Sequence, residues 1–118
     1  ETSPEYQIID DVNFPAKLED SQKAGADYAM YSPGANKVLK PVGEWNTSRI
    51  IFNNGRVEHW LNGIRIVKFK AWTKAWHKLR SEGKWKEYTD YGLSPEGKIG
   101  LQDHGNKAYF KNIQIREL

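Results

Sequence analysis

The stretch RIIFNNGRVEHWLNG, Arg49 to Gly63, decides the fold that we predict for this chain. Asn54-Gly55 is the strongest short-range signal for a two-residue β-hairpin loop, because both residue types tolerate positive φ. The stretch therefore predicts two antiparallel strands, Trp45–Phe52 and Arg56–Leu61. The expected opposite pairs are Asn53 with Arg56, Phe52 with Val57, Ile50 with His59, and Arg49 with Trp60.

The register sorts the side chains of the hairpin onto two faces, because side chains alternate along a strand. We expect a core face made of Ile50, Phe52, Val57, His59 and Leu61. The opposite face could line a groove, and it carries Thr47, Arg49, Ile51, Glu58, Trp60 and Asn62. A slip of one residue would exchange the two faces and reverse the positions of His59 and Trp60.

Alternation of polar and apolar residues predicts further strands on both sides of the hairpin. They are Glu5–Asp10, a short candidate at Ala26–Tyr31, Ile64–Phe69 after the turn at Asn62-Gly63, Lys98–Asp103 and Ala108–Leu118. A bulge near Lys111-Asn112 would keep the apolar residues of the last strand on one side. Trp72–Glu82 has the composition of a helix with a buried tryptophan stripe, and Gly83 would end it.

The composition limits the class of protein. A chain of 118 residues with 38% hydrophobic residues can build one core, so we expect a single domain over residues 1–118. The absence of cysteine excludes disulfides and thiolate sites. No apolar run is long enough to span a membrane. Five tryptophans, six tyrosines and four phenylalanines are more than this core needs, so some rings should be exposed.

The charge distribution argues against a nucleic-acid partner. The formal net charge is +3, and acidic and basic residues are interspersed over most of the length. The one basic stretch, Lys68–Lys86, is more typical of a solvated helical face than of a phosphate-binding patch.

The predicted elements indicate an all-β sandwich of antiparallel strands with one short helical excursion. Two sheets need more strands than this chain supplies, so we expect part of the natural domain to lie upstream of Glu1. An incomplete sandwich would leave an open sheet edge, which invites association with a complementary chain or with a second copy.

Four segments together resemble the 3-keto-disaccharide hydrolase domain family. They are EYQIIDD at Glu5–Asp11, KPVGEWNTSRI at Lys40–Ile50, VEHWLNG at Val57–Gly63, and GKIGLQDHG at Gly97–Gly105, which is followed by FKNIQIREL. The resemblance covers nearly all of the chain, and the LQDHG motif with its following strand is rather specific. It implies a concanavalin-like jelly-roll sandwich, of which this chain is the larger C-terminal part, and an extracytoplasmic location.

The resemblance also implies action on a carbohydrate ligand, a glycoside oxidised to a ketone at C3. Such a ketone acidifies the C2 hydrogen, so a base can remove it and the enolate can expel the C1 substituent before water adds. The reaction needs a base, a group or metal ion that holds the enolate oxygen, and an acid for the leaving group. A noncatalytic carbohydrate-binding module is the main alternative, and a protein-interaction domain is the third.

His104 fits the role of the base best, because an imidazole takes and returns protons near neutral pH and this one follows a predicted strand beside Gly105. Asp103 could orient that ring or bind a cation. The candidate catalytic set is therefore His104, Glu5 and Asp103. Alternation places Gln102 on the same side as His104 and Asp103 on the other.

Oxygen-bearing side chains near the N-terminus are the candidate ligands of the sugar. Glu5 and Gln7 share a strand face and Asp10 lies at the strand end, so they suit sugar hydroxyls or a divalent cation, Ca²⁺ or a transition metal. The remaining candidate substrate-binding residues are Trp60 as a stacking platform, Arg49, Gln102 and His59. The hairpin register nevertheless favours His59 as a core histidine, and Arg49 with Glu58 as a structural ion pair.

Overall fold

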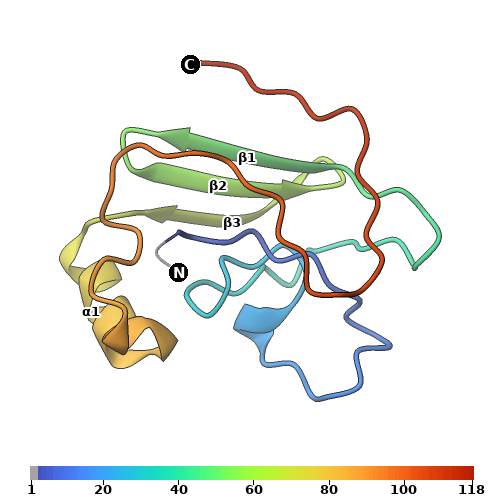
Figure 1. The fold of residues 1–118 in the computed structure, drawn as a ribbon, viewed down its shortest axis with the longest axis horizontal. Coiled ribbons are helices and arrows are strands. Elements are labelled where there is room, and N and C mark those ends of the chain that lie inside the picture. The colour runs from blue at the N-terminus through green and yellow to red at the C-terminus, as the bar shows by residue number, and fades with distance from the viewer. Residues whose placement is uncertain (1–2) are drawn as a thin grey trace.

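A three-stranded antiparallel sheet lies at the centre of the computed structural model, which describes residues 3–118 (Figure 1). The strands are adjacent in chain order: β1 is Ser48–Asn53, β2 is Arg56–Leu61 and β3 is Ile64–Lys70. A 3-10 turn, η1 (Asp20–Gln22), precedes the sheet, and the helix α1 (Lys74–Glu82) and the 3-10 helix η2 (Lys84–Glu87) follow it. The regular structure is thus mostly antiparallel strand with one α-helix, as the sequence predicts.

The hairpin forms in the predicted register. Phe52 pairs with Val57, Ile50 with His59, and Arg49 with Trp60. Asn54 and Gly55 have φ of 48° and 76°, which is the left-handed conformation that a two-residue hairpin loop requires. The local chemistry of two residues therefore determines which side chains share each face of β1 and β2.

The two hairpin glycines give a matched test of this geometry. Gly55 (φ 76°) and Gly63 (φ 81°) both hold a left-handed backbone, so alanine at Gly63 should cost about 1 kcal/mol of unfolding free energy. A Cβ at Gly55 would in addition lie 3.0 Å from two carbons of the Trp72 ring, whereas nothing lies within 4 Å at Gly63. We expect G55A to be destabilised by about 1–3 kcal/mol more than G63A in urea unfolding. Equal losses would mean that the Trp72 contact is unimportant.

A bulge in β3 brings two successive apolar residues into the core. Trp60 pairs with Arg65 and His59 with Val67, so Ile66 is the extra residue. Both Ile66 and Val67 are buried and, with Leu61, form one hydrophobic cluster. On the predicted core face, Val57, His59 and Leu61 are buried, but Ile50 and Phe52 of β1 are exposed. The prediction holds for β2 and is wrong for β1, an edge strand on which Phe52 makes an edge contact with the Trp72 ring but stays largely exposed.

A second cluster, rich in aromatic rings, joins the helical region to the sheet. Trp76, Trp85 and Tyr91 are almost completely buried, and Tyr91 stacks on Trp85 with ring centroids 4.2 Å apart. Thr73 caps α1 by accepting a hydrogen bond from the amide of Trp76. The predicted helix begins two residues later than expected because Trp72 has φ of 62°, which a helix cannot contain.

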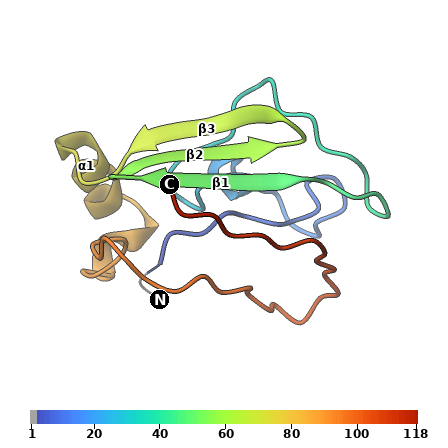
Figure 2. The same cartoon turned by 90° about the horizontal axis from the view of Figure 1, so that it is seen from above.

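The other predicted strands do not form. Glu5–Asp10 and Ala26–Tyr31 contribute only isolated bridges, in which Asp27 pairs with Tyr6 and with Tyr31. Lys98–Asp103 and Ala108–Leu118 belong to no sheet of the described chain. In Figures 1 and 2 the C-terminal segment, orange to red, passes beside the sheet without joining it. The polar–apolar alternation of these segments is therefore not enough to make them strands.

Within residues 3–118, no helix is both long enough and apolar enough to cross a membrane.

Candidate functional site

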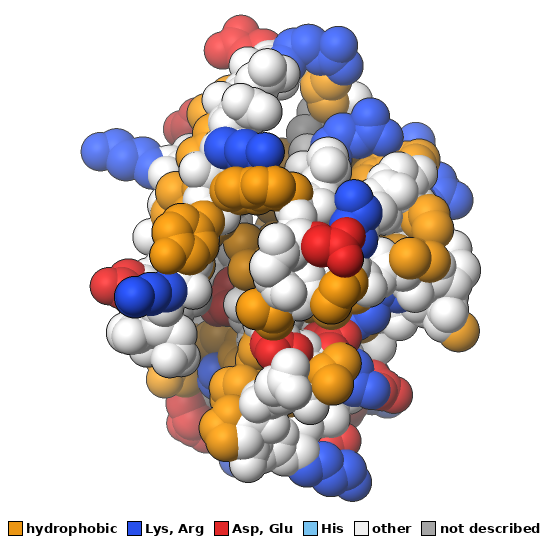
Figure 3. Space-filling model, turned by 90° about the vertical axis from the view of Figure 1, so that its right-hand side faces the viewer, with side chains coloured by type: hydrophobic (Ala, Val, Ile, Leu, Met, Phe, Trp, Pro, Cys, Tyr) orange, Lys and Arg blue, Asp and Glu red, His pale blue; other side chains and the backbone are white. Residues whose placement is uncertain are grey.

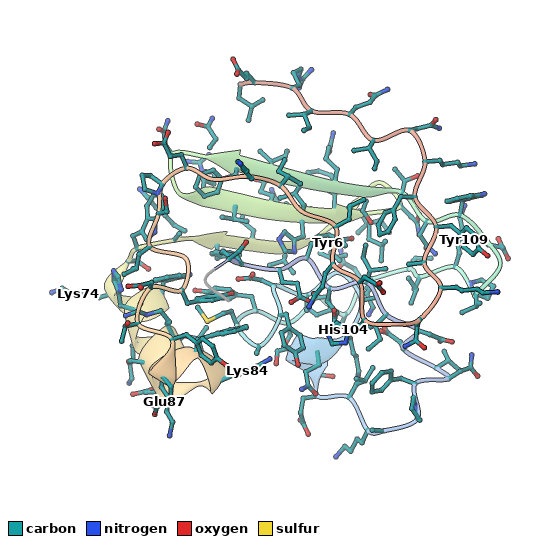
Figure 4. The ribbon with its side chains drawn as sticks, viewed as in Figure 1. Tyr6, Lys74, Lys84, Glu87, His104 and Tyr109 are labelled. Carbon is teal, nitrogen blue, oxygen red and sulfur yellow. The ribbon has the colours of Figure 1, made fainter. Side chains whose placement is uncertain are left out.

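Three candidate residues from opposite ends of the chain meet at the surface. In the orientation that satisfies its hydrogen bonds, the amide of Gln102 donates to both carboxylate oxygens of Glu5 at 3.2 Å. The carbonyl oxygen of the same amide accepts a hydrogen bond from Nε2 of His104 at 3.1 Å. The structure thus joins the N-terminal glutamate and the C-terminal histidine through one glutamine. Figure 4 labels His104 on the C-terminal segment.

Backbone hydrogen bonds fix the position of Glu5. The amide of Tyr28 donates to the carbonyl of Glu5 at 3.0 Å, and the amide of Gln7 donates to the carbonyl of Ala26 at 3.0 Å. Between them, Tyr6 packs its ring against buried His59, with centroids 4.8 Å apart. Because side chains alternate along extended backbone, anchoring Tyr6 inward directs Glu5 to the opposite side.

The hydrogen bond to Gln102 selects a tautomer of His104. A carbonyl oxygen only accepts, so Nε2 carries the proton in this arrangement. In the neutral ring Nδ1 then holds the free lone pair and is the atom able to accept a proton. The His104 side chain is exposed, so that atom is accessible to a ligand.

Asp103 has a structural role in this arrangement. Its Oδ1 accepts a hydrogen bond from the amide of Gly105 at 2.7 Å, and Gly105 has φ of 81°. This is a side-chain-stabilised turn, in which the carboxylate holds the bend that follows His104. The sequence analysis expects Asp103 to orient the His104 ring, but the structure records no contact between the two side chains.

The expected group of oxygen ligands near the N-terminus does not assemble. Asp10 accepts hydrogen bonds from the backbone of Val12 and Asn13, which with the Asn13 side chain lower its pKa. The amide of Gln7 donates to the carbonyl of Gln22 at 3.2 Å. In residues 3–118 no three His, Asp or Glu side chains gather as a metal would require. Gln7 and Asp10 thus make their hydrogen bonds to different parts of the chain.

His59 is an interior residue, as the hairpin register favours. It is 3% exposed, and its Nδ1 lies 2.9 Å from the carbonyl oxygen of Gly25. Burial lowers the pKa of His59, and the hydrogen bond to Gly25 partly opposes that effect. A ring held in this way has no access to a ligand at the surface, so assigning it to substrate binding is wrong for this structure.

Trp60 and Arg49 line a separate, shallow pocket. Its volume is about 200 Å³, and its lining is Thr47, Arg49, Trp60 and Gly63. The guanidinium of Arg49 lies 4.5 Å from the centre of the Trp60 ring and covers one of its faces. Glu58 pairs with Arg65 at 3.5 Å rather than with Arg49. The pocket shares no residue with the group formed by Glu5, Gln102 and His104.

Sequence reasoning missed two buried polar groups beside Glu5. Asp27 is 1% exposed and Tyr91 is completely buried, and in the described chain Oδ1 of Asp27 and the hydroxyl of Tyr91 have no hydrogen-bond partner. Burial raises the pKa of Asp27 to about 7, the backbone amide of Glu5 opposes the rise, and the charge of Glu5 adds to it. The one available signal was the small-residue run Ala24–Ala26, which is typical of close backbone packing.

The comparisons with known proteins point to one family. The model of the 3-keto-alpha-glucoside-1,2-lyase-like domain matches residues 1–116. A 3-keto-disaccharide hydrolase from Bacteroides thetaiotaomicron is 35% identical over 129 aligned positions, which cover 99% of this chain and 44% of that protein. A crystal structure of a candidate glycosyl hydrolase from Parabacteroides distasonis superposes with a TM-score of 0.73 at 45% identity. That match covers 78% of this chain and 45% of the other, so the chain spans less than half the length of both relatives.

Proposed function

The chain belongs to the 3-keto-alpha-glucoside-1,2-lyase-like domain family, and from this premise we propose that it takes part in cleaving 3-keto-glycosides by elimination and hydration. The names of the two relatives support a carbohydrate-active domain. The observation that carries the finer proposal is the exposed imidazole of His104, joined through Gln102 to Glu5. A jelly-roll sandwich and an extracytoplasmic location belong to the same proposal and rest on the family alone.

The proposed reaction balances without an external oxidant or reductant. The base takes the C2 proton, and the electron pair of that bond forms an enolate whose charge is on the C3 oxygen. The enolate then expels the C1 substituent, which leaves with a proton. Water finally adds across the C1=C2 double bond, so that hydroxyl attaches to C1 and a proton returns to C2.

The residues of the site have distinct tasks in this scheme. His104 takes the C2 proton on Nδ1, the atom that the hydrogen bond to Gln102 leaves free. Gln102 is a positioning residue that fixes the ring and its tautomer. The carboxylate of Glu5 holds the amide of Gln102 from its other side.

The experiment follows proton exchange at C2. Purified full-length protein is incubated with an aryl 3-keto-glucoside in D₂O, and aglycone release and deuterium at C2 are measured together. We expect both, because elimination must break the C2–H bond. The matched control is the same glycoside with a hydroxyl at C3, which should not react. Aglycone release without deuterium at C2 would contradict the eliminative route.

The same experiment separates an enzyme from a binding module. A noncatalytic module would leave the 3-keto-glycoside intact while still showing a saturable change in tryptophan fluorescence on titration with the sugar. That result would overturn the proposed reaction, and the chain would then be a module that binds a carbohydrate ligand. If there is neither turnover nor a saturable change in fluorescence, the remaining interpretation is a protein-interaction domain.

A further inference from the structure

The outward face of the sheet, opposite to the buried residues of β2, carries an excess of positive charge. Side chains alternate along the strands, so the register places every second residue of β1 and β2 on this face, together with their partners on β3. The charged residues of the face are Arg49, Arg56, Glu58, Arg65, Lys68 and Lys70. All of them except Glu58 are basic and exposed. By contrast, acidic and basic side chains are mixed on the side of the molecule that Figure 3 shows.

Both oxygens of the one acidic residue on this face are already engaged. Oε2 of Glu58 accepts a hydrogen bond from Nε1 of Trp60 at 3.0 Å, and Oε1 lies 3.5 Å from Nη1 of Arg65. Within residues 3–118 the structure records no ion pair for the other four basic residues of the face. These four side chains are therefore available to an anionic ligand.

Arg49 is the best oriented of these four basic residues. Its guanidinium lies 4.5 Å from the centre of the Trp60 ring, and the hydrogen bond to Glu58 holds that ring in turn. The structure records no hydrogen bond from the N–H groups of Arg49 to any other described residue. A stacked guanidinium with free N–H groups is suited to a carboxylate, which accepts two parallel hydrogen bonds from it.

The pocket beside Arg49 has room and polar groups for a sugar ring. Its volume is about 200 Å³, and Thr47 supplies a hydroxyl group to its lining. Gly63 has no side chain, and nothing lies within 4 Å of the position that a Cβ would take there. One face of the Trp60 ring is covered by Arg49, so that face does not stack on a sugar. The pocket therefore suits an acidic sugar better than a neutral sugar that depends on ring stacking.

We propose that this pocket binds a hexuronate residue of an anionic glycan, with Arg49 holding its carboxylate and Thr47 one of its hydroxyls. Successive rows of outward side chains are about 7 Å apart along the strands, so Lys68 and then Arg56 with Lys70 follow the Arg49 row. These cations pair with carboxylates of the neighbouring sugar residues. A nucleic acid fits less well, because its bases stack on open aromatic faces and the names of the relatives indicate a carbohydrate-active domain.

The pocket and the candidate catalytic group lie on different sides of β2. Trp60 faces outward, whereas its neighbour His59 is buried and packs against the ring of Tyr6. Glu5 points away from Tyr6, on the far side of this layer. A glycan in the pocket therefore leaves His104 accessible. The inference goes beyond the proposed elimination and does not rest on it, because binding in the pocket needs no turnover.

Calorimetric titration of the purified chain with a galacturonate hexamer tests the proposal. We expect saturable binding that weakens as salt is added, because dissolved ions screen exposed charges. The matched control ligand is the same hexamer with its carboxylates methyl-esterified, and we expect it not to bind. An oligonucleotide of equal charge is the second comparison, and we expect it to bind more weakly than the hexamer.

Variants of single cations locate the binding site. Arg49→Gln removes the guanidinium and should weaken binding of the hexamer by about tenfold or more. Arg49→Lys keeps the charge but loses the paired hydrogen bonds, so its affinity should lie between those of R49Q and wild type. Lys74→Gln removes the same charge from an exposed residue of α1, outside the sheet, and should leave the affinity unchanged. The melting temperature of each variant checks that it is folded.

Three results would overturn the proposal. The first is a hexamer that shows no saturable binding. The second is equal affinity for the esterified hexamer or for the oligonucleotide, because the chain would then not recognise the carboxylates of a sugar. The third is a folded R49Q variant that binds the hexamer as tightly as wild type.

Discussion

His104→Ala should lower kcat on a 3-keto-glycoside by about 10²–10⁴-fold, the usual contribution of a general base. The side chain is exposed, and its hydrogen bond to Gln102 leaves Nδ1 free to take the C2 proton. Removing the ring removes that proton acceptor and changes no other side chain of the proposed site. The measurement is steady-state aglycone release together with the rate of deuterium incorporation at C2. Both rates should fall by the same factor.

Matched variants separate proton transfer from folding. His77→Ala removes an exposed histidine of α1, outside the group formed by Glu5, Gln102 and His104, and should leave kcat unchanged. Gln102→Ala frees the imidazole to rotate, so kcat should fall less than in H104A and the pH profile should change while KM stays similar. If H104A retains full turnover with a normal melting temperature, His104 is not the base.

The hairpin could be predicted from sequence because the residues that determine it are adjacent in the chain. Asn54 and Gly55 fix the loop by their own backbone conformation, and the register of every pair in β1 and β2 follows. The bulge predicted near Lys111-Asn112 is not tested, because Ala108–Leu118 forms no strand, although Asn112 has φ of 54°. Ala108–Leu118 has the periodicity of a strand but belongs to no sheet of the described chain, because periodicity within a segment does not show whether another strand lies beside it.

The candidate site, too, could be predicted only in part from the sequence. Periodicity alone places Glu5 on one side of its segment, but it cannot bring Glu5 to a glutamine near the other end of the chain. Only the resemblance to a known family placed Glu5 and His104 in the same candidate site. Asp27 escaped prediction because nothing in a single aspartate between Ala26 and Tyr28 tells whether its carboxylate is solvated or buried.

The burial of Asp27 should make the stability of the protein fall as pH rises. Its pKa is about 7 in the folded state and 3.8 ordinarily, so between these values the folded protein keeps a proton that the unfolded chain has lost. The unfolded state then binds fewer protons, and the free energy of unfolding decreases with increasing pH. The full loss is on the order of 4 kcal/mol, complete above about pH 7.

Asp27→Asn removes this titration, so the variant should lose the part of the pH dependence that belongs to Asp27. Urea unfolding followed by the fluorescence of buried Trp76 and Trp85 at pH 5, 6, 7 and 8 measures it. The difference between wild type and variant isolates Asp27 from His59. The lowered pKa of His59 has the opposite effect, since stability falls as the unfolded chain takes up that proton below about pH 6.5.

The control is Asp90→Asn, which makes the same chemical change at an exposed aspartate. The pH dependence of its unfolding free energy should be the same as in wild type. A wild-type minus D27N difference that stays constant from pH 5 to pH 8 would mean that Asp27 is ionised throughout. The orphaned Oδ1 of Asp27 and the hydroxyl of Tyr91 would then need a partner that neutralises the charge. The predicted fall in stability with rising pH instead requires that the carboxyl group of Asp27 is protonated, a form that burial stabilises without any cation.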